Sequence, residues 1–389
     1  MKPNPRFPTL PALGAAAVAA ALAAGGVDAQ QEPPLADAGA SQIATAADLA
    51  EVLATFEDFV ERQRHEHDVL RRKIDDLMFF MRLSDVAEIQ MVTYRSHPPR
   101  WPDSDGSLSY PTLVHEQGDS LTIPAYVFIP HDLDRNGQHP LIVLPHGGVH
   151  SNFSSGTANI LREMLQQGYT VIAPEYRGST GFGRAWYRQI DYGDTEVFDS
   201  YNARNFALRT YPFLDEDRTA VVGWSHGGLH ALFNVFRFPD AYAVAYAGVP
   251  VSDLVARLGY TGQGYREQYW ADYHIGISDR AAIPELRKRS PSWNTEQYQG
   301  TPLMITSNTN DDDVDVLEVE RLIQALEASG KTGFRYRIYE EAPGRHSFDR
   351  GDNELASEQR REMYEFLAQH LHPARPLAYT VLGAESSPN

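Results

Sequence analysis

The stretch Thr219-Ala220-Val221-Val222-Gly223-Trp224-Ser225-His226-Gly227-Gly228 decides the fold. Apolar β-formers lead into a Gly-x-Ser-x-Gly-Gly turn, and a helix-forming segment, 229–236, follows at once. A strand, a tight turn and a helix in this order expose a serine hydroxyl at the tip of a sheet, beside the free N–H groups of a helix N-terminus. Strand and helix crowd each other there, so glycine is needed around the serine. We therefore expect Ser225 to be a nucleophile; an ordinary glycine-rich turn is the alternative.

Strand and helix patterns alternate along most of the chain. The run Pro140-Leu141-Ile142-Val143-Leu144-Pro145 is continuously apolar, which is typical of a strand buried on both faces of a parallel sheet. The other predicted strands are 87–94, 112–115, 123–129, 169–173, 219–222, 243–248, 302–306 and 334–339, with a turn at 117–119. The predicted helices are 197–208, 229–236, 316–328 and 354–371. This alternation predicts an α/β fold with a doubly wound, mostly parallel sheet.

Two polar loops follow the last two predicted strands. The first is Asn308-Thr309-Asn310-Asp311-Asp312-Asp313-Val314, and the second contains His346. A serine hydroxyl needs a base to take its proton, and a histidine base needs an acid to orient it. In such a sheet the chain order is serine, acid, histidine, each after a different strand. The order predicts a triad of Ser225, an aspartate of the first loop and His346, whereas an acidic loop alone is more often a solvated turn or a weak calcium site.

A site of this kind also needs donors for the negative charge that develops on the attacked carbonyl oxygen. One expected donor is the backbone N–H of His226. The other is expected in the loop after the first parallel strand, where Gly147 and Gly148 allow the backbone to approach a substrate. The ring of His146 either adds a donor or supports this loop through a structural hydrogen bond, and we favour the supporting role.

Several stretches resemble the catalytic domain of the prolyl oligopeptidase (S9) family of serine peptidases, most closely its acylaminoacyl-peptidase and dipeptidyl-peptidase branches. The resemblance covers about Val86 to His372 and rests on HPLIVLPHGGVHS (139–151), EYRGSTGFGRAWY (175–187), GWSHGG (223–228), SPSW (290–293), the acidic loop and GRHSF (344–348). It implies an α/β-hydrolase fold. It also implies that the acid is the aspartate three residues before Val314, namely Asp311, with Asp312 as the alternative.

The chain also departs from the family pattern. The family has a large N-terminal β-propeller, and we expect none here because few residues precede Val86. The glutamates that hold a free substrate amine in dipeptidyl peptidases belong to that region. His146 stands where some members carry an oxyanion tyrosine. The fold and the triad are therefore expected to carry over, whereas the peptide specificity is not.

One stretch, 252–299, interrupts the alternation and is rich in Tyr, Trp and Arg. Because it breaks the alternation, we expect it to be an excursion that passes over the active site. Aromatic walls bind apolar groups through buried area, so we expect apolar substrates to be preferred over charged ones. The candidate substrate-binding residues are Tyr260, Tyr265, Tyr269 and Trp270.

The first residues have the composition of an export signal. Lys2 and Arg6 precede an Ala-rich apolar stretch, and Val27-Asp28-Ala29 offers a small-x-small cleavage site. The stretch is too weakly apolar for a good membrane span, which is the alternative. We therefore expect a cleaved signal peptide at 1–29, no stable membrane anchor, and a periplasmic or secreted protein.

The rest of the chain divides by composition and spacing. Residues 30–45 form a Pro/Ala/Gly-rich linker, 46–85 a helical segment, 86–375 the catalytic domain and 376–389 a C-terminal tail. Apolar residues in the helical segment recur at three- and four-residue spacing. We expect it to pack on the side of the catalytic domain, with a dimerisation helix or a partial lid as alternatives.

Charge and composition limit the partners. The formal net charge of −18 makes nucleic acid an unsuitable partner. The chain has no cysteine, so an exported fold is held without disulfides. No histidine spacing indicates zinc, and we expect no metal and no cofactor. The oligomeric state is left open, a homo-oligomer included.

Together these features predict an exported serine hydrolase that works through an acyl-enzyme, with a small peptide or an ester as substrate. A prolyl-oligopeptidase-like peptidase acting on short peptides is the favoured interpretation. A carboxylesterase on the same fold is the alternative, since fold alone does not separate the two. A non-catalytic binding protein is the third hypothesis.

Overall fold

The computed structural model describes residues 46–98, 101–102, 108–109, 120–270 and 282–377. The chain divides into two compact units, Met1–Phe56 and Glu57–Asn389. The described part of the first unit is the beginning of helix α2 (Ala46–Leu83), and the second unit contains the rest of that helix and the sheet. Of the helices described, none combines the length and the apolar character that crossing a membrane requires.

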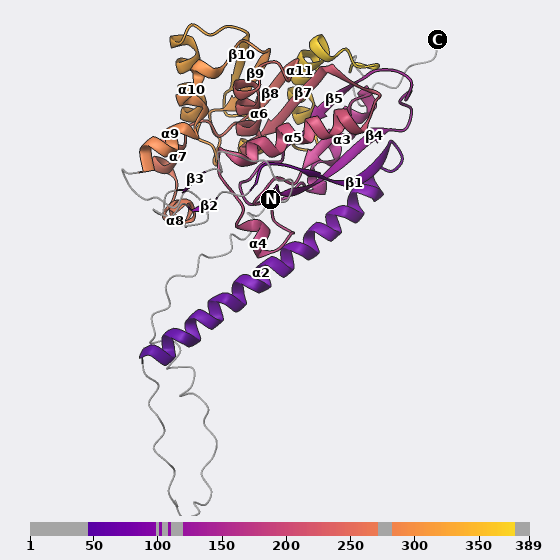
Figure 1. The fold of residues 1–389 in the computed structure, drawn as a ribbon. Coiled ribbons are helices and arrows are strands. Elements are labelled where there is room, and N and C mark those ends of the chain that lie inside the picture. The colour runs from indigo at the N-terminus through magenta and orange to yellow at the C-terminus, as the bar shows by residue number, and fades with distance from the viewer. Residues whose placement is uncertain (1–45, 99–100, 103–107, 110–119, 271–281, 378–389) are drawn as a thin grey trace, which may run out of the picture. The chain divides into compact units, whose positions relative to one another are not determined.

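An eight-stranded sheet is the centre of the second unit (Figure 1). From one edge to the other, its strands are β1 (Ala87–Arg95), β4 (Thr122–Pro130), β6 (Thr170–Pro174), β5 (His139–Val143), β7 (Leu214–Trp224), β8 (Val244–Gly248), β9 (Leu303–Asn308) and β10 (Phe334–Tyr339). Strand β4 is antiparallel to both β1 and β6, and all later neighbours are parallel. The short strands β2 (Trp101–Pro102) and β3 (Leu108–Ser109) pair with each other. The predicted doubly wound, mostly parallel sheet is confirmed.

The helices that follow α2 among the described residues are, in chain order, α3 (Ala158–Gln167), α4 (Arg184–Tyr187), α5 (Thr195–Thr210), α6 (His226–Arg237), α7 (Leu254–Tyr260), α8 (Gln263–Trp270), α9 (Ile283–Lys288), α10 (Val316–Ala328) and α11 (Glu354–Leu371). Short 3-10 turns lie at Ser155–Thr157, Pro291–Trp293, Thr295–Gln297 and Arg345–Ser347.

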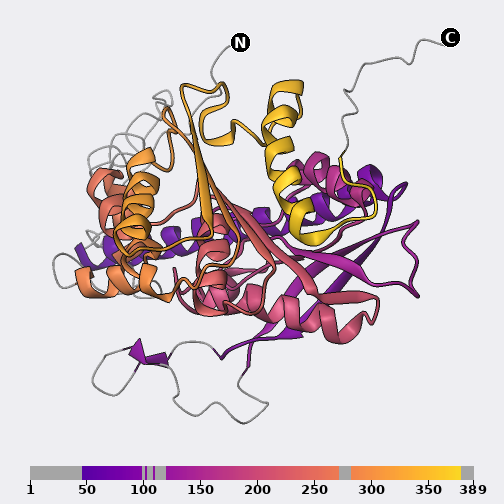
Figure 2. The same cartoon turned by 90° about the horizontal axis from the view of Figure 1, so that it is seen from above.

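Helices cover both faces of the sheet, because successive side chains of a strand point to opposite sides. On β5, Leu141 and Val143 pack in a core with α5, α6 and α10. Ile142 and Leu144 pack in a second core with α3, α11 and the end of α2. Figure 2 shows α10 and α11 on either side of the strands. Burial on both faces explains why the sequence around β5 is continuously apolar.

Most predicted elements differ from the observed ones only at their ends, and β10, α10 and α11 have the predicted bounds. Helix α3 was not predicted. The stretch 252–299 contains the short helices α7, α8 and α9. The N-terminal helical segment is one continuous helix of 38 residues. The predicted strand 112–115, the turn 117–119, the signal peptide, the linker and most of the C-terminal tail lie outside the described residues.

Candidate active site

Ser225 lies between strand β7 and helix α6. Its backbone has φ 58° and ψ −121°, and a positive φ is costly for a residue with a side chain. Neighbouring backbone holds this conformation. The N–H of Ser225 donates to O of Gly248 at 2.9 Å, and O of Ser225 accepts from N–H of Val251 at 3.1 Å. The serine is therefore fixed at the carboxyl edge of the sheet and at the start of a helix.

The glycines around Ser225 are required by close backbone packing. A Cβ on Gly223 would lie 2.1 Å from O of Gly227, and one on Gly227 would lie 2.3 Å from O of Pro145. Neither position has room for a side chain. The Gly-x-Ser-x-Gly pattern is thus a consequence of strand β7 and helix α6 meeting at a sharp angle beside the end of β5.

His346 and Asp311 meet at the same edge of the sheet. Asp311 follows β9 and His346 follows β10, and Nδ1 of His346 lies 2.8 and 2.9 Å from the two carboxylate oxygens of Asp311. Oδ1 of Asp311 also accepts from the N–H groups of Asp313 and Val314, both at 2.9 Å. The carboxylate is fully buried. Asp312 instead pairs with Arg345 at 3.1 Å, so Asp311 is the aspartate placed to orient the imidazole.

Ser225 and His346 line one cavity of about 290 Å³. Its apolar wall includes Phe153, Ile160 and Trp224. The structure thus brings the hydroxyl, the imidazole and the carboxylate of the predicted triad to one end of the sheet. Nucleophilic attack on an acyl carbon needs a hydroxyl, a base that takes its proton and an acid that orients the base.

Backbone from two loops surrounds Ser225. A Cβ on Gly147 would lie 3.4 Å from Cβ of Ser225, so the loop after β5 touches the serine turn. Gly148 has φ 81° and lines the same cavity. His226 is the first residue of α6, where N–H groups have no acceptor within the helix. The three residues expected to form an oxyanion hole are therefore all adjacent to Ser225.

The ring of His146 supports this loop. Its Nε2 lies 2.9 Å from Oγ of Ser179, and its ring stacks on Tyr176 with centroids 4.1 Å apart. The hydroxyl of Tyr176 donates to O of Gly148 at 2.6 Å. Tyr176 and Ser179 belong to the Arg-Gly-Ser-Thr-Gly-Phe-Gly region that carries the family resemblance. These contacts match the supporting role that we favoured for His146.

Glu196, His226 and His230 form a fully buried cluster behind the serine turn. Nε2 of His226 lies 3.5 Å from Oε1 of Glu196, and one ligand atom from each residue lies within 4.8 Å of the others. Burial raises the pKa of Glu196 to about 8 and lowers the pKa of both histidines well below its ordinary value. All three groups are therefore uncharged near neutral pH.

This cluster is the one group of described residues with the donors to hold a metal ion. It offers three ligands, whereas a structural zinc site takes four. Both carboxylate oxygens of Glu196 already accept backbone N–H groups, from Gly193 and Asp194. Both ring nitrogens of His226 and Nε2 of His230 are buried without a hydrogen-bond partner among the described residues.

A second cavity, of about 200 Å³, also reaches Ser225. Its wall includes Tyr192, Arg257, Tyr265 and Asp313. Asp313 lies 3.0 Å from Nη2 of Arg257 and, through its other oxygen, 3.8 Å from Nε2 of His346. The carboxylate of Asp313 thus links the guanidinium of Arg257 to the imidazole of His346.

The four predicted substrate-binding residues have different positions. Tyr265 lines the second cavity, and Tyr269 is buried and stacks on Tyr192 with centroids 4.7 Å apart. Neither cavity at Ser225 counts Tyr260, Tyr269 or Trp270 among the described residues of its wall. The hydroxyl of Tyr260 donates to the carboxylate of Glu318, and Trp270 packs against the hydrophobic core. Of the four predicted residues, Tyr265 is the one on the described wall of a cavity at Ser225, and the prediction is corrected for the other three.

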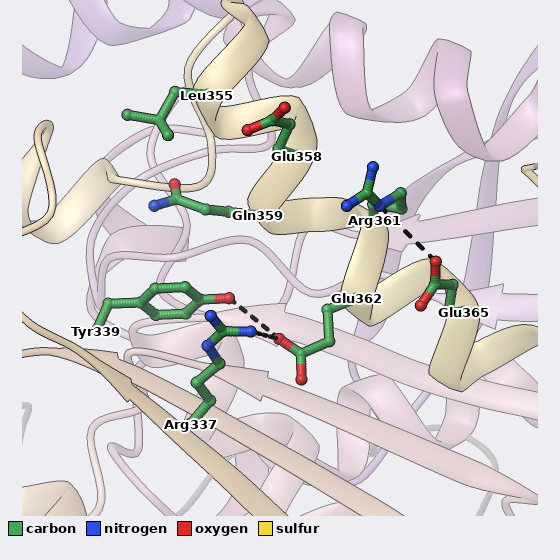
Figure 3. A pocket seen from close by; sticks show the side chains of 8 residues that line it. All are labelled: Arg337, Tyr339, Leu355, Glu358, Gln359, Arg361, Glu362 and Glu365. Atoms are coloured by element: carbon green, nitrogen blue, oxygen red, sulfur yellow. Dashed lines mark hydrogen bonds and ion pairs between the residues drawn. The ribbon is translucent and has the colours of Figure 1, made fainter. Parts of the chain in front are cut away.

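A larger cavity, of about 560 Å³, lies between β10 and α11, away from these residues (Figure 3). Its charged side chains pair with one another. Glu362 accepts from Arg337 at 2.7 Å and from the hydroxyl of Tyr339 at 3.3 Å, and Arg361 lies 3.7 Å from Glu365. The paired charges and the distance from Ser225 indicate a surface groove rather than a catalytic pocket.

Sequence reasoning missed Tyr192, Arg257 and Arg350 as residues of the site. Arg350 lines the first cavity and donates to O of His346, and burial lowers its pKa. Its position four residues after His346 was the available signal. Arg257 lies in the stretch 252–299 that was expected over the active site, but no motif distinguished it there, and no motif marked Tyr192.

Comparison with known proteins gives a consistent result. The model of the prolyl oligopeptidase family matches residues 154–374. The chain is 28% identical to dipeptidyl aminopeptidase BIII of Pseudoxanthomonas mexicana over 59% of its own length and 33% of the relative's. It is 28% identical to the acylamino-acid-releasing enzyme of Mus musculus over 55% of its own length and 28% of the relative's. The chain thus spans about a third of the length of these curated relatives.

Solved structures with the same fold include an acylaminoacyl peptidase in complex with Z-Gly-Gly-Phe-chloromethyl ketone. Its TM-score is 0.57 at 16% identity, with 76% of this chain and 43% of that chain covered. A puromycin hydrolase has a TM-score of 0.57 at 22% identity, with 74% and 40% covered. At these identities the likeness establishes the fold.

Proposed function

The chain belongs to the prolyl oligopeptidase family of serine peptidases, and from this premise we propose that it is an exported enzyme that cleaves short peptides through an acyl-enzyme on Ser225. The observation that supports the proposal most is the pairing of His346 with the buried Asp311, opposite a strained Ser225 in one cavity. A positive φ at a serine persists only where the surrounding structure enforces it. Here the enforced conformation presents the hydroxyl to the cavity that also contains the imidazole.

The proposed reaction has two halves. Oγ of Ser225 attacks the acyl carbon while Nε2 of His346 takes its proton, and a tetrahedral intermediate forms. The bond to the leaving amine then breaks, and His346 delivers the proton to the amine. Water repeats the sequence on the acyl-enzyme and releases the acid. Asp311 holds the proton of the imidazole on Nδ1 and stabilises the imidazolium while it exists.

The oxyanion of each intermediate is assigned to the N–H of His226 and to the backbone of Gly147 or Gly148. One donor of this kind contributes roughly 3–4 kcal/mol to transition-state stabilisation. The contact of Gly147 with the serine turn supports this assignment, and so does the support that His146 and Tyr176 give the loop.

The two cavities at Ser225 suggest which substrates fit. The larger has an apolar wall of Phe153, Ile160 and Trp224, and the smaller carries the ring of Tyr265. Apolar side chains next to the cleaved bond should therefore be favoured over charged ones. We further propose that a free substrate amine is not needed, since Asp313, the one carboxylate among the described residues that line the two cavities, already pairs with Arg257.

Labelling and hydrolysis together test the proposal. The wild type should react with a fluorophosphonate probe, and Ser225→Ala should not. Purified protein should hydrolyse N-acylated and free aminoacyl-anilides at comparable kcat/KM, and Ser225→Ala should lose at least three orders of magnitude while its thermal midpoint is nearly unchanged. Hydrolysis of p-nitrophenyl esters without any anilide turnover would replace the peptidase with the carboxylesterase. A wild type that neither labels nor turns over would favour the binding protein.

Export is part of the proposal and rests on the sequence of residues 1–29. Mass spectrometry of the protein recovered from a bacterial periplasm should give a mature N-terminus at Gln30. An intact N-terminus in that fraction would contradict cleavage.

A further inference from the structure

Helix α2 carries an apolar row that its own domain leaves uncovered. Within the second unit, Val60, Leu70, Ile74, Leu77 and Met81 are between 49% and 77% exposed. Large apolar patches are rare on the surface of monomeric proteins and usually mark an interaction site. The row therefore indicates a surface that another molecule covers.

The row follows a heptad repeat. Steps of three and four residues alternate through Val60, Gln63, His67, Leu70, Ile74, Leu77 and Met81. The same steps continue toward the N-terminus through Phe56, Leu53 and Leu49. This spacing places all these residues on one narrow seam, and its persistence over three or more heptads is the signature of a coiled coil. Phe59 and Phe80, which are 50% and 45% exposed, immediately precede seam residues and widen the apolar surface on one side of the seam.

The opposite face of α2 is occupied by the helix's own domain. In the heptad, the positions farthest from the seam are Asp58, His65, Arg72 and Phe79. Asp58 lies 2.6 Å from Nη1 of Arg184, and Nε of Arg72 donates to O of Gly181 at 3.0 Å. His65 and Phe79 are buried. The helix is thus fixed to the domain with its seam directed away from it.

We infer that α2 pairs in parallel with α2 of a second copy of this chain, so that the protein is a homodimer held by a two-stranded coiled coil. Charges beside the seam fit this partner. Glu66 immediately precedes the seam residue His67, and Arg71, five residues after Glu66, immediately follows the seam residue Leu70. In a parallel pair these two positions face each other across the interface, and the contact is made twice.

The polar seam residues favour the same arrangement. Gln63 and His67 interrupt an otherwise apolar seam, and both are exposed. In an in-register parallel pair each meets its own copy, and a polar seam residue of this kind fixes register at some cost in stability. Because the domains lie opposite the seam, both are on the outside of the pair. None of the described residues that line the two cavities at Ser225 lies on α2, so pairing leaves these cavities open.

The mass of the full chain in solution tests the pairing. Light scattering at micromolar concentration should give a dimer for the wild type. The double variant Ile74→Glu, Leu77→Glu should be a monomer, with its dimer dissociation constant raised by about two orders of magnitude or more, because charge cannot be buried in the seam. Leu317→Glu, which changes an exposed apolar residue of α10, is the matched control and should remain dimeric.

Cross-linking tests the parallel orientation of the two helices in a variant that has no charge introduced into the seam. The chain has no cysteine, so Met81→Cys is its single thiol. In a parallel pair Met81 meets its own copy and a short bis-maleimide should join the two, whereas an antiparallel pair places them at opposite ends. Glu327→Cys on the exposed side of α10 should not cross-link. A monomeric wild type, a double variant that stays dimeric, or Met81→Cys without cross-linked dimer would each overturn the inference. None of these outcomes depends on the proposed peptidase activity.

Discussion

At the scale of single residues, the two aspartates near His346 have unequal roles. Asp311 contacts Nδ1 with both oxygens and is fully buried, whereas Asp313 is 56% exposed and lies 3.8 Å from Nε2. Asp311→Asn should cost about four orders of magnitude in kcat, because an amide favours the wrong histidine tautomer. Asp313→Asn should cost less than tenfold. Steady-state kinetics of the two variants checks this, and a larger loss for Asp313→Asn would contradict the assignment.

Glu196 gives the stability of the fold a predictable pH dependence. Its pKa is raised from 4.5 in the unfolded chain to about 8 in the fold by burial. The folded state therefore keeps a proton that the unfolded state loses, so the stabilisation is complete below pH 4.5 and is lost as the pH rises toward 8. Glu196→Gln should flatten this decline, by up to about 1.4 kcal/mol per pH unit.

Urea unfolding at several pH values measures that slope. The exposed Glu327→Gln is the control for the loss of one carboxyl, and it should keep the slope of the wild type. Equal slopes for the wild type and Glu196→Gln would show that the carboxyl of Glu196 ionises in the fold as it does in the unfolded chain.

Residues that belong to a motif were predictable, and residues that reach the site through packing were not. Ser225 and His346 follow strands in the chain order typical of such a sheet, and the structure places them in one cavity. Tyr192, in the loop before α5, and Arg257, in α7, line the second cavity because of how these two segments pack. Tyr260 was misplaced for a related reason: its hydroxyl is drawn to the buried Glu318, whose presence beside it depends on α10.

At the scale of elements, the junction of β7 and α6 should tolerate no added side chain. Gly227→Ala would put a methyl group 2.3 Å from O of Pro145. The backbone must then shift, at a cost of about 1–3 kcal/mol, and Ser225 shifts with it. We expect kcat/KM to fall at least a hundredfold. Gly259→Ala in α7 is the control, because nothing lies within 4 Å of its added methyl group; it should stabilise by about 0.4–1 kcal/mol. Denaturation and kinetics of both variants check the pair.

Elements with a strong local pattern were found, and those defined by contacts were missed. The strands β5, β8 and β9 are apolar runs buried on both faces, and α10 shows a clear apolar stripe. Helices α7 to α9 are short, and the residues that they bury are Leu254, Arg257, Tyr269 and Leu286. Arg257 is held there by an ion pair with Glu318 of α10 at 3.2 Å. Such segments carry no periodicity from which a helix could be predicted.

At the scale of the whole molecule, one ion pair joins three distant segments. Arg177 and Asp199 are fully buried and 2.7 Å apart. Asp199 also accepts from Ser96, and Arg177 donates to O of His97 at 2.9 Å. The pair thus ties the chain after β1 to the end of β6 and to α5.

Removing one partner of this pair should be costly. Arg177→Met leaves the carboxylate of Asp199 buried and unpaired, and we expect a loss of about 3–5 kcal/mol. The double change Arg177→Met, Asp199→Leu should be less destabilising than the single one. Chemical denaturation of the single and double variants measures this difference. A free energy of unfolding that is lower for the double variant than for Arg177→Met would contradict this expectation.

The contact between Trp224 and Asp349 has a consequence for the timing of folding. The indole beside the nucleophile donates to this carboxylate at 2.7 Å, although the two residues are 125 positions apart in the chain. At a synthesis rate of roughly 5–20 residues per second, about 6–25 s separate their appearance at the ribosome. During that interval the serine turn lacks its histidine, its acid and the carboxylate that anchors its tryptophan. The proposed hydrolysis therefore cannot begin on a nascent chain until Asp311, His346 and Asp349 have been made, after nearly all of the sheet.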